Sequence, residues 1–380
     1  MSQAVSSPAK NSAGLEGVVA APSEICFIDG IAGRLIYRGY EIADLVENAT
    51  FEETAYLLWH NRLPNRAELT ELRAQLAANA ALPPHTIAVL KVLPKGADPM
   101  DVLRTTVSSL ASLDPDLHSD DSEANLRKAT RLTAQFPTIV ASFHRLRQGK
   151  KLMEPDPGLG IAANFLYLLN GKKPHDTLTR VLDAALVLHA EHGFNASTFA
   201  ARVTAATLAD MHAAITAAVA ALKGPLHGGA NQEVMQLLLD CGDADAAEQR
   251  VRTMLANGEK IPGFGHRVYR TVDPRATFLR KMSKQLGEAA GNTKWYEMSE
   301  RLIPIVKELK NKDPNVDFFS ASAYYTMGIP IDLYTPIFAI ARIAGWTAHV
   351  MEQQSNNRII RPQDDYRGPF DRKVVPIDQR

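Results

Sequence analysis

Apolar residues recur every three or four positions along most of the chain beyond residue 50, which is the spacing of amphipathic helices. Before that point, residues 25–38 form two short β-rich runs around Gly30 and Gly33, which predict a hairpin. Strands are too few for a parallel sheet, so the pattern predicts an all-α protein with a small N-terminal hairpin. We expect helices at 51–60, 65–78, from 99 onward, and at 179–192, 197–223, 232–239, 244–256, 273–286, 294–310, 316–327 and 335–352.

Several of these helices have recognisable ends. Asn65 with Glu68 three residues later is a capping pattern, and Pro99 stands at a first helical position, where its missing N–H costs nothing. The helix expected at 197–223 is rich in alanine and ends at a Gly-Pro pair. Its small side chains would let helices of this chain or of a second copy approach closely. The segments 114–125 and 150–158, and the tail from residue 356, are polar and predict connections.

Composition and charge narrow the class of protein. The chain has 380 residues, of which 46% are hydrophobic and 22% are charged, a balance typical of globular proteins. Its 42 basic residues equal its 42 acidic residues, so the net charge is zero. This removes the usual electrostatic argument for a nucleic acid or an anionic membrane as partner. Any anion must therefore be held by a local cluster of arginines and histidines.

The two cysteines and the N-terminus predict a cytoplasmic location. Cys26 and Cys241 form neither a disulfide framework nor a metal-binding spacing. The first residues are small and polar, without the features of a signal or transit peptide, and predict a disordered tail. No apolar run is long enough to span a bilayer. Asn48 and Asn195 match the glycosylation pattern, which means nothing without secretion.

The first candidate segment for chemistry is KGPLHGGANQ at residues 223–232. His227 follows a helix end and precedes two glycines, which allow the backbone to approach a ligand. A helix beginning near Ala230 would point N–H groups at that ligand. The alternative interpretation is a surface histidine in a flexible turn.

The second segment is IPGFGHRVYRTVDPR at residues 261–275. His266 is followed by Arg267, Arg270 and Arg275, with Asp273 as the one acid, and this composition favours a polyanionic ligand. The helix dipole disfavours an arginine in a first helical turn, so Arg275 calls for an anionic partner. The alternative is a solvated basic face.

The third segment is residues 314–345, where charged residues stand among apolar ones. Asp317 lies beside Phe318 and Phe319, an environment that should raise its pKa toward that of a general base. Arg342, one turn after Phe338 in an apolar helix, needs a partner because an unpaired buried charge is costly. The alternatives are a helix-capping aspartate and a structural salt bridge.

A fourth cluster, His189-Ala-Glu191-His192, is weaker evidence for a metal. It has no HExxH pattern and no nearby third ligand, so we predict no metal site. A histidine that faces a cleft from the end of an apolar helix is the simpler interpretation.

Together these segments resemble the signature blocks of the citrate synthase family. The matching runs are HAEHGFNAST, GPLHGGANQEV, PGFGHRVYRTVDPR, NVDFFSASAYYTMGIP and TPIFAIARIAGW…RIIRP, within a likeness that extends from about Gly14 to the C-terminus. The chain resembles the short dimeric type, without the additional N-terminal domain of the longer NADH-regulated type. The resemblance implies a two-domain helical fold, with large-domain segments at 1–220 and 326–380 and a smaller domain at 221–325.

The resemblance also implies roles for individual residues. His227 matches the histidine that hydrogen-bonds the thioester carbonyl, Asp317 the base that deprotonates the acyl α-carbon, and His266 the histidine that polarises the ketone of oxaloacetate. Arg270 matches a phosphate contact for coenzyme A, and Arg361 an arginine supplied by the partner subunit of a homodimer with shared sites. The residues implied for oxaloacetate binding are His192, Arg275, Phe338, Arg342 and Arg361.

Three functions follow as hypotheses. The first is condensation of acetyl-CoA with oxaloacetate and hydrolysis of citryl-CoA to citrate, with no cofactor. The second is 2-methylcitrate synthesis from propionyl-CoA, toward which SASAYYTMGIP and NNRIIRP lean, while the Phe318-Phe319 pair departs from many members of the family. The third is a non-catalytic protein that binds CoA or a dicarboxylate.

Overall fold

The computed structural model describes residues 13–15 and 17–380. The predicted disordered tail falls almost wholly on residues 1–12, which lie outside the described residues. Along the described chain, no helix combines the length and apolar character that crossing a membrane requires. The cytoplasmic location stays a prediction.

The predicted N-terminal hairpin is confirmed and belongs to a three-stranded antiparallel sheet of order β1-β2-β3. Strand β1 (Cys26–Asp29) pairs with β2 (Arg34–Tyr37), and β2 pairs with the short β3 (Tyr40–Glu41), which the sequence pattern did not predict. At the β1–β2 turn, Oδ1 of Asp29 accepts hydrogen bonds from the N–H groups of Ile31 and Ala32. The turn is therefore stabilised by its own residues.

Every regular element after β3 in the described chain is a helix, so the all-α fold class is confirmed. The capping pattern at Asn65 and the proline at residue 99 begin helices as predicted. Four helices were not predicted: α1, α4, α6 and α7. The helices of the first half are α1 (Ile42–Asn48), α2 (Phe51–His60), α3 (Arg66–Asn79), α4 (Pro84–Val92), α5 (Pro99–Leu110), α6 (Ser122–Arg147), α7 (Ile161–Asn170) and α8 (Asp176–His189). Those of the second half are α9 (Ala196–Ala205), α10 (Met211–Lys223), α11 (Ala230–Cys241), α12 (Ala244–Ala256), α13 (Pro274–Ala289), α14 (Lys294–Lys310), α15 (Val316–Thr326) and α16 (Tyr334–Ser355).

Two predicted helix boundaries were wrong in ways that affect the site. The single helix expected at 197–223 is two helices, α9 and α10, because Leu208 adopts a left-handed conformation with φ of 65° and Asp210 caps the start of α10. The helix expected at 179–192 is α8, which ends at His189. His192 therefore lies in the turn between α8 and α9, where its side chain is not restricted to a helix face.

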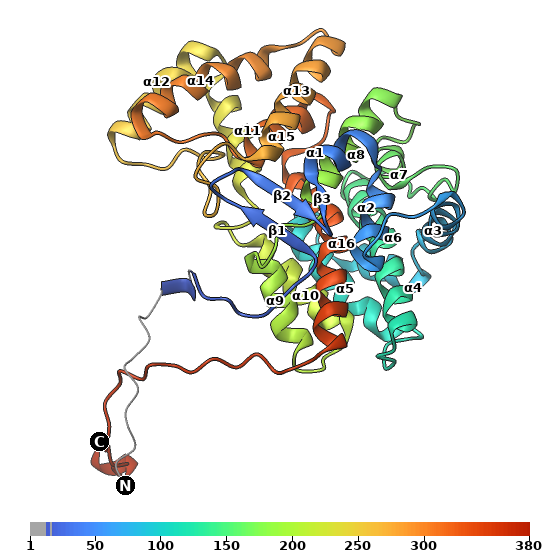
Figure 1. Ribbon diagram of the computed structural model, residues 1–380, viewed down its shortest axis with the longest axis vertical. Coiled ribbons are helices and arrows are strands. Elements are labelled where there is room, and N and C mark those ends of the chain that lie inside the picture. The colour runs from blue at the N-terminus through green and yellow to red at the C-terminus, as the bar shows by residue number, and fades with distance from the viewer. Residues whose placement is uncertain (1–12, 16) are drawn as a thin grey trace.

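Helix α16 runs through the middle of the molecule, with α5–α10 around it, while α11–α15 gather at one end (Figure 1). Most of α16 is buried, including the large side chains of Trp346 and Arg342. At Gly345, a Cβ atom would lie 2.4 Å from the carbonyl oxygen of Ala190, so only glycine permits this approach. This contact brings α16 against the end of α8 and places Arg342 beside the α8–α9 turn.

Candidate active site

His227 lies in a tightly packed turn between α10 and α11, and α11 begins at Ala230 as predicted. At Gly228, a Cβ atom would stand 2.4 Å from the carbonyl oxygen of Leu222. The Gly228 carbonyl also accepts a hydrogen bond from Oγ1 of Thr335, at 2.9 Å. The turn is therefore held by α10 and α16, which argues against a flexible surface histidine.

One ring nitrogen of His227 has its hydrogen-bond partners within the protein. Its Nε2 accepts a hydrogen bond from the N–H of Ser197 at 3.2 Å and lies 2.8 Å from Oγ of Ser197. That hydroxyl accepts a hydrogen bond from Nε1 of Trp346, and its single proton has two acceptors within reach, Nε2 of His227 and, at 2.7 Å, Oδ1 of Asn195. A backbone N–H can only donate, so Nε2 carries no proton and Nδ1–H is the donor in the neutral ring. Burial, together with the charge of Arg342, lowers the pKa of His227 to about 4.

The contacts of Ser197 and Asn195 that hold the His227 ring were not predicted from the sequence. Asn195 was interpreted only as a glycosylation pattern, although Asn-x-Ser is also a helix-capping sequence. In the structure Asn195 caps α9 and its side chain also bonds Ser197. The capping pattern could have been recognised, but nothing local indicates that α9 begins next to His227.

The ring of His266 is held from its own loop. Its Nδ1 accepts hydrogen bonds from the N–H groups of Val268 and Tyr269, at 3.0 and 3.2 Å. The proton of the neutral ring is therefore on Nε2, which is free to donate to a ligand. Burial and the nearby Arg275 charge lower the pKa of His266 to about 4. The two histidines are thus both neutral donors at physiological pH, through opposite ring nitrogens.

His192 lies beside His266, with ring centroids 5.1 Å apart. Its Nε2 is 3.2 Å from the hydroxyl of Tyr269, a residue that sequence reasoning did not single out. Burial and the positive charge of Arg275 hold the pKa of His192 well below its usual value. The turn after α8 therefore meets the loop that carries His266, which brings two of the predicted site residues together.

Arg275 is not part of a solvated basic face, because it and Asp273 are 2% and 1% exposed. Nε and Nη2 of Arg275 bond the two carboxylate oxygens of Asp273, at 3.0 and 2.8 Å. The anionic partner of Arg275 in this structure is therefore Asp273. The same carboxylate accepts from the N–H of Val316, which ties the start of α13 to the start of α15.

Asp317 is not the cap of α15, since Asn315 occupies that position and accepts from the Asp317 N–H. Oδ1 of Asp317 is buried and has no hydrogen-bond partner among the described residues. Desolvation raises the pKa of Asp317 to about 7, against the opposing charge of Arg275. Asn315 also bonds the backbone of Gly263 and Gly265, so Asp317 is held next to the loop that carries His266.

Arg342 forms no ion pair within the described residues, which argues against the structural salt bridge considered from the sequence. It is 1% exposed, its Nε donates to the carbonyl of His189 at 2.7 Å, and its guanidinium lies 4.7 Å from the centroid of Phe338. Desolvation lowers the pKa of Arg342 to about 10, which leaves it charged at neutral pH. The Phe338 ring also contacts His189 and His227 edge-on. A buried cation with free donors in this position suits a ligand carboxylate.

Two predicted site residues lie outside this cluster. Arg361 is exposed on the extended tail that leaves the body after α16 (Figure 1). The side chain of Arg270 is also exposed, on the loop between His266 and α13. Within the described part of the chain, no three His, Cys, Asp or Glu side chains are grouped as metal ligands. In the fourth cluster, Glu191 instead bonds Nε2 of His349, at 3.1 Å.

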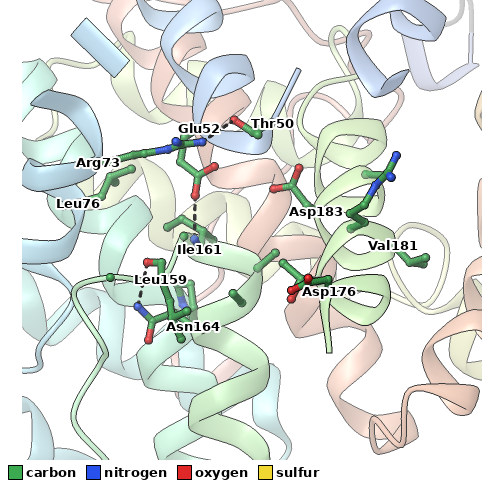
Figure 2. Close-up of a pocket in the computed structure, with 18 of the residues that line it drawn as sticks. Thr50, Glu52, Arg73, Leu76, Leu159, Ile161, Asn164, Asp176, Val181 and Asp183 are labelled. Carbon is green, nitrogen blue, oxygen red and sulfur yellow. Dashed lines mark hydrogen bonds between the residues drawn. The ribbon is translucent and has the colours of Figure 1, made fainter. Parts of the chain in front are cut away.

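A separate hollow of about 1080 Å³ lies between the α1–α2 junction, α3, α7 and α8. Figure 2 shows Glu52 and Asp183 pointing toward each other at its wall, with Arg73 nearby. Glu52 accepts a hydrogen bond from the N–H of Ile161, and Asp183 from that of Phe51. Both carboxylates therefore serve the first turns of helices, and none of the candidate catalytic residues lines this hollow.

Comparisons with known proteins identify the family of this chain. The family model described as "Citrate synthase, C-terminal domain" matches residues 14–363. The chain is 52% identical to "Citrate synthase 2" of Bacillus subtilis, over 97% of this chain and 98% of that protein. It is 45% identical to "2-methylcitrate synthase" of Shewanella oneidensis, with the same coverage. The structure superposes on that of citrate synthase from Thermoplasma acidophilum, in its ternary complex with carboxymethyl coenzyme A and oxaloacetate, with a TM-score of 0.92. The two chains are 32% identical, and the match covers 97% of this chain and 99% of the other. This chain therefore belongs to the citrate synthase family.

Proposed function

We propose that this protein condenses acetyl-CoA with oxaloacetate and hydrolyses the resulting citryl-CoA to citrate and CoA. The observation that carries the proposal is a buried carboxylate, Asp317, whose Oδ1 has no hydrogen-bond partner among the described residues. It occurs in one chain with two neutral histidines whose donor nitrogens are set by backbone N–H groups. A thioester α-proton is weakly acidic, so a base alone is insufficient to remove it. A donor at the developing enolate oxygen supplies the missing stabilisation.

In the proposed mechanism, Asp317 takes the α-proton while Nδ1–H of His227 donates to the thioester oxygen. The new carbon–carbon bond forms as the enolate carbon attacks the ketone carbon of oxaloacetate. Nε2–H of His266 gives its proton to the ketone oxygen, which becomes the hydroxyl of citryl-CoA. Water then adds to the thioester carbonyl and returns a proton to His266. The carbon–sulfur bond breaks, and the protonated Asp317 gives its proton to the departing thiolate, so that CoA and citrate leave with both side chains restored.

The buried cations suit the carboxylates of oxaloacetate. Arg342 has no anionic partner within the described residues, and its guanidinium is stacked on Phe338. Arg275 binds Asp273 through Nε and Nη2, which leaves the Nη1 edge for a ligand oxygen. His192 completes this group beside His266. The exposed Arg270 is proposed to contact a phosphate of CoA.

We also propose that residues 221–325 form a smaller domain that closes over the substrates. This segment contributes His266, Arg275 and Asp317, whereas Phe338 and Arg342 come from α16. Closure would exclude water until the carbon–carbon bond has formed. Small-angle scattering with and without oxaloacetate and carboxymethyl coenzyme A tests this, since an unchanged radius of gyration would contradict closure.

A homodimer with shared sites is the proposed assembly. The tail after α16, which includes Arg361, is exposed along nearly its whole length in one chain and runs away from the helical body (Figure 1). An arginine so placed can complete a site only in a second copy. Sedimentation analysis beside activity tests this, because a fully active monomer would overturn it.

The acyl donor is tested by thiol release from acetyl-CoA and propionyl-CoA, in parallel, with oxaloacetate. Identity favours acetyl-CoA, at 52% to the citrate synthase against 45% to the 2-methylcitrate synthase. We expect the higher kcat/KM with acetyl-CoA, and a higher value with propionyl-CoA would favour the second function. One methylene is worth only about 1–3 kcal/mol, so turnover of both is compatible with either assignment. Absence of thiol release would indicate a binding protein.

A further inference from the structure

The turn between β1 and β2 contacts the loop that carries His266. The carbonyl oxygen of Gly30 accepts a hydrogen bond from the N–H of Arg270, at 2.8 Å. At the other end of the turn, a Cβ atom on Gly33 would lie 2.9 Å from Cγ2 of Thr271. Residues separated by more than 230 positions are therefore in direct backbone contact, and Figure 1 shows the hairpin next to the group of helices α11–α15.

The contact at Gly30 leaves no room for a side chain. A Cβ atom there would lie 2.3 Å from the carbonyl oxygen of Val268 and 2.9 Å from its carbonyl carbon. Gly30 does not have a positive φ, so its backbone conformation does not require glycine. The close approach of the 268–270 backbone is the reason that this position needs glycine.

The same short stretch of backbone orients the His266 ring. The N–H of Val268 donates to Nδ1 of His266, while the carbonyl of that residue packs against Gly30. The N–H of Tyr269 donates to the same ring nitrogen, and the N–H of Arg270 donates to Gly30. The hairpin turn and the imidazole therefore hold residues 268–270 from opposite sides.

The hairpin does not need this contact for its own turn. Asp29 already satisfies the N–H groups of Ile31 and Ala32, and the side chains of Phe27 and Ile31 are 55% and 85% exposed. The His266 loop, in contrast, has few regular backbone hydrogen bonds of its own between residues 266 and 272. The contact thus constrains the loop more than it constrains the hairpin.

We propose that Gly30 is a positioning residue for His266: its backbone holds residues 268–270 so that their N–H groups keep Nδ1 occupied and Nε2–H aimed at the ketone. This inference rests on the role proposed for His266. It predicts that a change of one methyl group in an N-terminal strand turn affects the carbonyl-polarising step and not CoA binding.

The test compares Gly30→Ala with Ile31→Ala, a matched control in the same turn whose side chain is exposed. We expect Gly30→Ala to lower kcat by about 10- to 100-fold, because misplacement by about 1 Å costs on that scale. The KM for acyl-CoA should stay within about twofold and the unfolding midpoint near that of wild type. Ile31→Ala should retain wild-type kcat. Its activity reports on the proposed function independently of Gly30, so a failure of the proposed function and a failure of the Gly30 proposal give different results.

Nitrogen-15 NMR of labelled histidine supplies the readout that a purely structural role would not change. In Gly30→Ala the His266 signals should shift from an Nε2–H tautomer toward exchange between tautomers, while the His227 signals stay unchanged. If Gly30→Ala fails to fold, Asp29→Ala loosens the turn without a steric clash and should change kcat and the His266 signals in the same direction. Unchanged kcat, or reduced kcat with an unchanged His266 tautomer, would overturn the proposal.

A double variant tests whether Gly30 acts through His266. Combined with His266→Asn, Gly30→Ala should cause little further loss of activity, because the residue through which it acts is already removed. Losses that multiply would show that Gly30 acts elsewhere and would also overturn the proposal.

Discussion

The N–H of Ser197 donates a hydrogen bond to Nε2 of His227 at 3.2 Å, across the start of α9. This bond decides which nitrogen of the ring carries the proton. The hydroxyl of Ser197, 2.8 Å from the same nitrogen, is in turn held by Asn195 and Trp346. The thioester-facing donor of the proposed site therefore depends on a residue from another helix.

Replacing that hydroxyl should affect both stability and rate. Ser197→Ala keeps the backbone donor, so the His227 tautomer is retained, but it leaves Nε1–H of the buried Trp346 without its acceptor. We expect the free energy of unfolding to fall by about 1–3 kcal/mol and kcat to fall by about 10-fold as the ring loosens. Denaturant unfolding and steady-state kinetics measure the two effects, with the exposed Ser112→Ala as control. Unchanged kcat would show that the ring needs only the backbone bond.

The pH dependence of activity should report Asp317. A general base acts as the carboxylate, and desolvation raises its pKa to about 7, so kcat/KM should rise with pH through about 7 and then level off. His227 and His266, with pKa values lowered to about 4, stay neutral over this range, so their titration does not change the pH profile of kcat/KM there. Asp317→Asn should remove condensation and leave oxaloacetate affinity nearly intact by calorimetry. A flat profile between pH 5 and 8 would contradict this assignment.

Stability should depend on Asp183 in the hollow of Figure 2. Desolvation, with the charge of Glu52, raises the pKa of Asp183 from 3.8 to about 8. Between these values the folded state binds a proton that the unfolded state does not, so stability falls as pH rises through the window. Asp183→Asn, which keeps an acceptor for the Phe51 N–H, should flatten this slope. Thermal melts from pH 5 to 8 on both proteins measure the difference, and parallel curves would contradict the raised pKa.

Shared sites predict complementation between two inactive variants. Arg361→Ala should fold normally but bind oxaloacetate weakly, and Asp317→Asn should be inactive. In a mixed dimer, one site combines the intact Asp317 of one chain with the intact Arg361 of the other. After unfolding and refolding an equal mixture, about a quarter of wild-type activity should return. Activity no higher than that of Arg361→Ala alone would mean that Arg361 serves its own chain or no site.

Local signals along the chain predicted much of the helical framework. The ranges 244–256 and 294–310 coincide with α12 and α14, and helices begin at the Asn65 capping pattern and at Pro99 where expected. These features depend on neighbours within one or two turns, so they can be read without the fold. Helices α6 and α7 were missed, although the amphipathic pattern of each is as strong as that of the predicted α12.

The sequence by itself determined which residues could do the chemistry: two histidines, a carboxylate among aromatic residues, and arginines in a neutral chain. It did not determine their protonation. The tautomers of His227 and His266 and the lack of an ion pair at Arg342 within the described residues depend on what lies opposite each group in space. Those partners come from other segments, as Ser197 does for His227, and only tertiary packing brings them within hydrogen-bonding distance.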